Sequence, residues 1–392
     1  MCIRDRNKTI LSGNIGNPLT FDNSYNVVIF RGNDTRTVLD GFTVEDGMAS
    51  GPTDAEQRGA GIYIEPALAN ANDHPIVRNC VIQGNNSDLG GAGAYVDDRR
   101  AMFINCQFTN NTSQDNGGGA LCRGTLGYAS FFGCQFNNNR ASEGGGLSSN
   151  YTELAVANCT FHKNTSTAGF GGGILARFDS VTVSNSILWE NEATSGNAQE
   201  EQVYVTGFGS SLTINHSCVE GWNGSYGGVG NIGDDPQFVD PDGDRIFDTD
   251  LRLCTNSPCI DTGDDTLVPE ELNSDLLGQA RIVGTVDMGA FENSGHALFQ
   301  WTGDSSVRDG DLLALHTCGG LAGSPMIFCV TGFNGVPFFL VVIDDTFDSN
   351  GKYSYSVTLP PGLSGITATF QTFGFDSGGT VGDSNPVDVY FE

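Results

Sequence analysis

Several aspartates near residue 245 have the type and spacing that a hard cation requires. They alternate around a glycine turn and are Asp240, Asp242, Asp244, Asp248 and Asp250. Ca²⁺ takes about six to eight oxygen ligands at roughly 2.4 Å, which carboxylates arranged in this way can supply. Gly243 comes too early for an EF-hand loop, and no glutamate stands at the twelfth position. The segment therefore predicts a calcium site, and a solvated acidic turn is the alternative.

A glycine-rich stretch just before these aspartates contains two further motifs. Residues 228–233 match the G-x-G-x-x-G pattern of dinucleotide-binding loops, but no strand and helix flank them and two aspartates follow. We therefore expect no dinucleotide site there. Trp222 and Tyr226 suit stacking on sugar rings or packing over the neighbouring chain, and we favour packing.

The composition of the 392-residue chain excludes several classes of protein. Asp and Glu number 47 against 18 Lys and Arg, so the net charge of −29 would repel nucleic-acid phosphates and anionic membranes. No apolar run approaches the roughly 20 residues of a membrane-spanning helix. The 54 glycines keep no three-residue period, which excludes collagen. We expect a folded monomer that has no transmembrane segment and does not bind nucleic acid.

The elements that would position any site come from an internal repeat. Glycine clusters begin 27 residues apart, at Gly90, Gly117, Gly144 and Gly171. A four-residue motif of the form N-C-x-F or a variant keeps step, at residues 79–82, 105–108, 133–136, 158–161 and 185–188. An asparagine follows three residues after each copy, at Asn85, Asn111, Asn139, Asn164 and Asn191.

A repeat of this length with short stretches of alternating polarity predicts strands rather than helices. Three short strands and three turns take about 25 residues, which is one rung of a parallel β-helix with rungs about 4.8 Å apart. Leucine-rich repeats share the period, but their leucine pattern is absent. We expect the asparagines to form a hydrogen-bonded ladder, the glycines to supply positive φ, and the Cys and Phe side chains to stack inside.

The repeat motifs also resemble those of a known group. F-x-x-N, as in Phe108 to Asn111, and G-G-A-L at residues 118–121 resemble the repeats of chlamydial polymorphic outer membrane proteins. More broadly, they and residues 38–44 resemble the right-handed parallel β-helix, or pectin-lyase-like, surface proteins of bacteria. The resemblance covers roughly residues 10–235 and implies an all-β fold with a β-helix over residues 1–235. It says little about activity, since one fold hosts many functions.

The sequence changes character after residue 235. Residues 236–293 resemble the choice-of-anchor type region of secreted bacterial β-helix proteins, and we expect them to form a cap over the last rung. Residues 297–392 contain six or seven short strand patterns and predict an immunoglobulin-like β-sandwich.

Eleven cysteines are present, and their positions suggest two roles. Cys80, Cys106, Cys134 and Cys159 share one position in the repeat, and we expect them to remain stacked thiols. Elsewhere we expect disulfides from Cys254 to Cys259 and from Cys318 to Cys329, in an oxidising compartment. No C-x-x-C pair occurs, which disfavours structural zinc.

The functional expectation is an exported bacterial surface protein that serves as a rigid rod for adhesion and contacts glycans or cell-surface proteins. The first residues are charged and lack an apolar core, so we expect an export signal upstream; a cytoplasmic protein is the alternative. The resemblance also admits a polysaccharide lyase or hydrolase acting on acidic polysaccharide. His162, Lys163 and Arg177 suit such a site, but solvated outward positions explain them equally well, and we expect no catalysis.

Overall fold

The computed structural model describes residues 9–15, 23–31, 37–66, 74–241, 249–293, 299–302, 306–307, 312–320, 323–334, 336–349, 351–358, 366–375, 379, 381–384 and 387–391. The chain divides into two compact units. One contains residues 1–235 and 261–292, and the other contains residues 236–260 and 293–392. The predicted cap is therefore shared between the two units.

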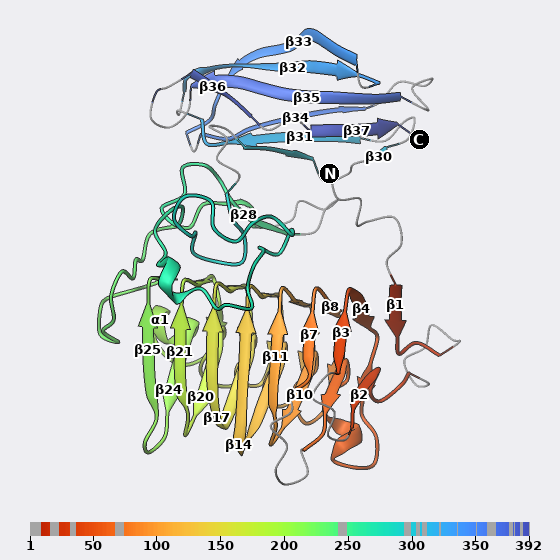
Figure 1. Ribbon diagram of the computed structural model, residues 1–392, viewed down its shortest axis with the longest axis vertical. Helices are drawn as coiled ribbons and strands as arrows, with labels where there is room; N and C mark the ends of the chain where they lie inside the picture. Colours follow the sequence, from red (N-terminus) through yellow and green to blue (C-terminus); the bar gives the residue numbers. More distant parts are fainter. Residues whose placement is uncertain are drawn as a thin grey trace. The chain divides into compact units, whose positions relative to one another are not determined.

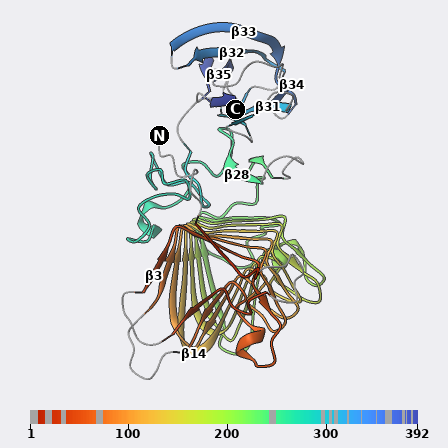
Figure 2. The ribbon, with the colours of Figure 1, turned by 90° about the vertical axis from the view of Figure 1, so that its right-hand side faces the viewer.

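The first unit is a parallel β-helix, as predicted from the repeat (Figures 1 and 2). Eight parallel strands form one sheet: β1 (Thr9–Ser12), β4 (Phe42–Glu45), β8 (Val81–Gln83), β12 (Gln107–Thr109), β15 (Gln135–Asn137), β18 (Thr160–His162), β22 (Ile187–Trp189) and β26 (Cys218–Val219). Six two-residue strands form a second sheet: β5 (Met48–Ala49), β9 (Asn86–Ser87), β13 (Thr112–Ser113), β16 (Arg140–Ala141), β19 (Thr165–Ser166) and β23 (Glu192–Ala193).

The third sheet has twelve strands in two ladders that share β14 (Ala120–Phe132) and β17 (Leu147–Ala157). The first ladder adds β2 (Val28–Phe30), β6 (Ile62–Ile64), β10 (Ala94–Asp97), β20 (Ile174–Arg177) and β24 (Val203–Thr206). The second adds β3 (Val38–Asp40), β7 (Ile76–Arg78), β11 (Arg100–Ile104), β21 (Ser180–Ser184) and β25 (Ser211–Asn215). Each rung therefore turns a corner within this sheet, and β14 and β17 run through the corner without a break.

The interior of the β-helix is a set of side-chain stacks. Phe136 lies between Phe108 and Phe161, with ring centroids 4.5 Å apart on each side. The four repeat cysteines are buried free thiols on successive rungs, and the amide of Cys134 donates to Sγ of Cys159 over 3.3 Å. The predicted thiol stack is confirmed.

The predicted asparagine ladder is also confirmed. Each side-chain amide donates to the carboxamide oxygen on the next rung, over 3.0 Å from Asn85 to Asn111 and 2.8 Å from Asn164 to Asn191. Each also donates to a backbone carbonyl, as Asn139 does to Phe108 over 2.8 Å. The last member of the ladder was not predicted from the sequence. Gln202, at the end of helix α1 (Ala198–Gln202), accepts from Asn191 over 2.6 Å.

The expectation that the clustered glycines supply positive φ is correct for only part of each cluster. The first residue of the trio does so, as Gly117 does with φ of 66°. The third residue of the trio must be glycine for another reason, because a β-carbon on Gly119 would lie 2.4 Å from the carbonyl oxygen of Gly146. Positive φ also occurs at the corner before each stacked cysteine or serine, with values of 46° to 63° at Asn79, Asn105, Gly133, Asn158, Asn185 and His216.

Two segments outside the rungs pack on the β-helix. Residues 220–235 cover the last rung, where the Ile232 amide donates to the Ser217 carbonyl over 3.0 Å. Trp222 and Tyr226 pack against the core, as expected. Residues 261–292, which include the 3₁₀ turn η3 (Asp265–Leu267), instead lie along the corner asparagines of several rungs. Their contacts reach Asn105, Asn158 and Asn185.

The second unit contains antiparallel sheets. β27 (Phe238–Asp240) pairs with β28 (Asp250–Leu253). β31 (Leu312–Cys318) lies between β29 (Phe299–Thr302) and β34 (Tyr353–Thr358). A further sheet contains β30 (Ser306–Val307), β37 (Val387–Phe391), β35 (Ile366–Phe375), β32 (Pro325–Phe333), β33 (Val336–Thr346) and β36 (Val381–Asp383). An immunoglobulin-like sandwich remains a prediction.

The predicted disulfide pairs are wrong. Cys254 is joined to Cys318, which ties residues 236–260 to the C-terminal strands, and Cys259 and Cys329 are buried free thiols. Cys318 and Cys329 belong to different sheets, not to adjacent strands of one sheet. Among the residues that the structure describes, no helix is long and apolar enough to cross a membrane.

The phenylalanine stack leads to a stability prediction. Phe136→Ala should lower the free energy of unfolding by about 3–5 kcal/mol, because it opens a cavity between two rings that cannot close up. Urea denaturation measures the change. Phe208→Ala is the matched control, since Phe208 is 99% exposed and its loss should cost less than about 0.5 kcal/mol. A similar cost for both variants would contradict the stacked core.

Candidate functional site

The corner within the twelve-stranded sheet is the irregular part of the repeat. Register pairs Asn150 with Arg177 and Arg177 with Thr206, so the residues that turn the corner on these rungs are Tyr151, Phe178 and Gly207. Tyr151 and Phe178 have φ of 59° and 60°. Bulky residues are genuine outliers in this left-handed region. Such strain persists only where the surrounding structure imposes it, and it clusters at functional sites.

The two strained side chains form an exposed aromatic pair. Their ring centroids lie 4.7 Å apart with an interplanar angle of 4°. Tyr151 is 48% exposed and Phe178 is 43% exposed, so the pair presents aromatic surface to solvent. The backbone of Gly207 lies close to the second ring, because a β-carbon there would stand 2.7 Å from Cδ1 of Phe178.

A buried carboxylate holds the corner in this conformation. Asp179 is 3% exposed and accepts a hydrogen bond from the Thr152 amide over 2.7 Å. Its other oxygen accepts from the Ser149 hydroxyl. Burial raises the pKa of Asp179, while the Ser149 hydroxyl and nearby amides oppose that rise. Asp179 thus ties its own rung to the residues on both sides of Tyr151.

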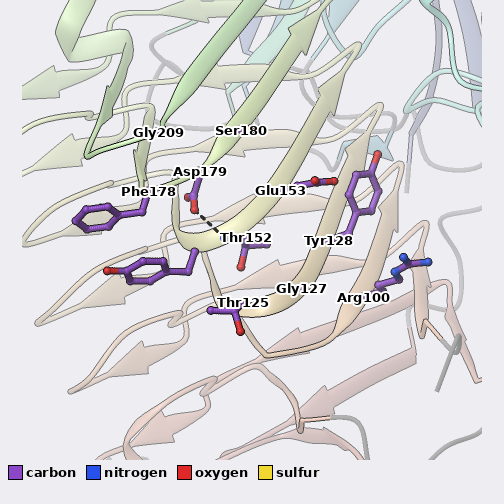
Figure 3. Close-up of a pocket in the computed structure, with 11 residues that line it drawn as sticks. Arg100, Thr125, Gly127, Tyr128, Thr152, Glu153, Phe178, Asp179, Ser180 and Gly209 are labelled. Carbon is purple, nitrogen blue, oxygen red and sulfur yellow. Dashed lines mark hydrogen bonds between the residues drawn. The ribbon is translucent and has the colours of Figure 1, made fainter. Parts of the chain in front are cut away.

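A hollow of about 410 Å³ lies at this corner (Figure 3). Its volume falls within the range of about 300–1,000 Å³ that is usual for ligand pockets. The residues that line it are Arg100, Thr125, Gly127, Tyr128, Tyr151, Thr152, Glu153, Phe178, Asp179, Ser180 and Gly209. The hollow therefore combines aromatic surface, hydroxyl groups and both signs of charge.

A second hollow, of about 500 Å³, is acidic. Its lining residues are Asn138, Lys163, Thr165, Glu190, Asn191, Glu192, Glu201 and Glu220. Lys163 Nζ lies 3.7 Å from Glu190 Oε2. Burial, and then the charges of Glu220 and Glu192, raise the pKa of Glu201. Carboxylates beside a cation are the kind of arrangement that glycan-cleaving sites use.

The basic residues singled out in the sequence are only partly brought together. His162 is fully buried, with Nδ1 3.1 Å from Asn137 Oδ1 and Nε2 3.2 Å from Glu190 Oε2. Its position beside Lys163 therefore borders the acidic hollow. Arg177 belongs to a different sheet and pairs with Glu143.

The predicted calcium ligands fall mostly outside the described residues, which include Asp240 and Asp250 but not Asp242, Asp244 or Asp248. Asp240 and Asp250 face each other across the β27–β28 pair. Nε of Arg252 donates to both oxygens of Asp250, over 2.8 and 3.0 Å. A cation would have to compete with this ion pair. Among the described residues no group of three or more His, Cys, Asp or Glu is arranged to hold a metal ion.

The aromatic corner, by which we mean the corner that carries Tyr151 and Phe178, was not predicted from the sequence, although the spacing of these residues was a signal. Tyr151 and Phe178 are 27 residues apart, which is the period of the repeat.

The G-x-G-x-x-G match belongs to the segment that covers the last rung. There, Asn231 donates to the Ile214 carbonyl over 2.8 Å.

Comparison with known proteins supports the fold. Residues 60–236 match a family model described as the right handed beta helix region. This agrees with the right-handed β-helix predicted from the repeat and with the stacked parallel sheets. No curated protein matches the chain. The comparison therefore bears on the architecture of the chain and not on its function.

The raised pKa of Asp179 predicts a pH-dependent stability. A carboxyl group with a folded pKa above its unfolded value of about 3.9 favours folding most at low pH, and this contribution is lost as pH rises through the folded pKa. Urea denaturation at several pH values should therefore show the stability of the wild type falling relative to Asp179→Asn as pH rises. For Asp264→Asn the difference should run the other way, because hydrogen bonds from Thr266 lower the pKa of Asp264.

The calcium prediction is tested by thermal unfolding. Millimolar Ca²⁺ should raise the melting temperature, because a ligand that binds only the folded chain stabilises it. The double variant Asp242→Asn/Asp244→Asn should lose this shift, whereas Asp250→Asn should keep most of it because Arg252 already holds Asp250. An equal melting temperature with Ca²⁺ and with a chelator would favour the solvated turn.

Proposed function

We propose that this chain is an exported bacterial surface protein whose β-helix serves as a rigid rod for adhesion through glycans, without catalysis. The β-helix supplies a scaffold in which each rung is fixed by its neighbours. The aromatic corner supplies a contact surface on that scaffold. Sites built on such rigid elements hold their geometry better than sites on loops.

The exposed aromatic pair is the observation that carries this proposal. Tyr151 and Phe178 are kept at the surface in a strained conformation by a buried carboxylate, rather than being turned inward. Aromatic rings present apolar faces that suit the C–H face of a sugar ring. The polar residues around the hollow can serve the sugar hydroxyls. This arrangement favours a glycan over a purely apolar ligand.

Two features support export. The chain has a net charge of −29 and 18 Lys and Arg in 392 residues, which suits a soluble surface protein and opposes binding to nucleic acid. The Cys254–Cys318 disulfide is typical of proteins that mature in an oxidising compartment.

The alternative is a lyase or hydrolase that acts on acidic polysaccharide, and the acidic hollow is the observation that favours it. Glu192, Glu201 and Glu220 lie there with Lys163 and Glu190. A hydrolase needs one carboxyl group that keeps its proton, and the raised pKa of Glu201 suits that role. Incubation with pectate and alginate, followed by reducing-end and unsaturated-uronate assays, distinguishes the two: products lost in Glu201→Gln would establish catalysis.

Glycan adhesion predicts a defined binding result. On a glycan array, the wild-type chain should bind a subset of glycans, and Tyr151→Ser/Phe178→Ser should bind them at least about ten-fold more weakly, the equivalent of about 1.4 kcal/mol. Thermal unfolding of the double variant checks that the fold persists. Absence of binding to every glycan, or cleavage of the bound ones, would contradict the proposal.

A further inference from the structure

In the stacked aromatic pair, Phe178 and Tyr151 each have one ring face that is turned away from the other ring. These two outer faces have different neighbours. The outer face of Phe178 lies against Gly207 of the next rung. On the other side of Tyr151 the strands lose their register. Arg123 pairs with Asn150 and Gly127 pairs with Thr152, so residues 124–126 stand opposite Tyr151 alone. Strand β14 therefore carries a bulge at the outer face of Tyr151.

This bulge borders the hollow at the corner. Gly124 has φ of 127°, and a β-carbon there would meet Asp98 of the preceding rung at 2.4 Å. Thr125 and Gly127, which follow it, line the hollow (Figure 3). Tyr151 lines the same hollow. Bulges are enriched beside functional sites, where they re-aim side chains and interrupt pairing. The hollow next to Tyr151 is thus bordered by a bulge of the preceding rung.

We propose that this space binds a sugar ring of a neutral glycan, stacked on the face of Tyr151 that is turned toward the bulge at residues 124–126. A ring placed there continues the stack of Tyr151 and Phe178 by one more layer. This inference rests on the proposed glycan contact, and it adds the position of the sugar and its chemical class.

The polar groups that line the hollow suit a ligand with hydroxyl substituents. Thr125, Tyr128 and Ser180 line the hollow with hydroxyl groups that donate and accept. Glu153 can accept from sugar hydroxyls, and Arg100 can donate to them. These residues come from strands or from the bulge of one β-sheet, so their backbone positions are fixed before a ligand arrives.

The charge decides between neutral and acidic sugars. Among the residues that line the hollow, Arg100 is cationic, whereas Glu153 and Asp179 are carboxylic acids. The whole chain carries −29, and a field of that sign lowers the local concentration of polyanions. A uronate polymer would meet this repulsion at every sugar, and a neutral polymer would not. We therefore expect neutral glycans at this corner, in contrast to the acidic polysaccharides considered for the acidic hollow.

A matched pair of polymers tests the inference. Polygalacturonate and its carboxyl-reduced form share one backbone and differ only in the carboxylate. Binding of the full chain to both, and to neutral mannan, galactan and β-glucan, is measured by isothermal calorimetry at low and high salt. The variants are Tyr151→Ala, Thr125→Trp, which fills the space, and Phe208→Ala, whose ring is exposed but does not line the hollow.

The inference expects binding to at least one neutral polymer with little salt dependence. Affinity should fall at least about ten-fold in Tyr151→Ala and Thr125→Trp and stay within about two-fold in Phe208→Ala. Stronger binding to polygalacturonate than to its reduced form would overturn the neutral class while leaving glycan contact intact. Neutral binding unaffected by both corner variants would overturn the position. Absence of binding to every polymer would overturn the proposed function as well.

Discussion

The hydrogen-bonded asparagine ladder is the constraint on which the rest of the β-helix depends. Each buried amide must find its partner on the next rung, so the chain between the stacked Cys or Ser and its asparagine cannot change in length. The distance from Cys80 to Asn85 is five residues, and the same five separate Cys106 from Asn111 and Ser186 from Asn191. Any variation in rung length must therefore occur elsewhere.

The remainder of each rung does vary, and the aromatic corner lies where it varies. From each ladder asparagine to the next stacked Cys or Ser, the chain advances by 21, 23, 20, 22 and 26 positions, the last of these from Asn191 to Ser217. The span of 23 contains the bulge at residues 124–126, and the span of 26 contains helix α1. Insertions thus occur outside the segment that joins each stacked Cys or Ser to its ladder asparagine, and one of them is the bulge at the corner of the twelve-stranded sheet.

Features that recur with the repeat could be predicted from the sequence, whereas contacts between residues outside the repeat could not. The ladder asparagines and stacked cysteines could be read because each position recurs at a fixed spacing. Gln202 could not be read as the end of the ladder, because it comes from a helix eleven residues after Asn191 and follows no period. The Cys254–Cys318 pairing spans 64 residues and depends on how residues 236–260 meet the C-terminal strands. The aromatic corner is an intermediate case. The spacing of Tyr151 and Phe178 matches the repeat and is visible in the sequence, but their exposure follows from a backbone conformation that the sequence does not reveal.

That conformation is the strongest reason to treat the corner as more than a turn. Many other left-handed positions hold residues that tolerate positive φ, such as Asn158 and Gly171, although Lys163 and Glu190 also have φ of 51° and 52°. Tyr151 and Phe178 are strained there, and Asp179 is buried at a further cost to hold the neighbouring amide. Asparagine or glycine would turn the same corner without either cost. A fold that needed only a turn would gain stability by losing these rings, which supports the proposed glycan contact.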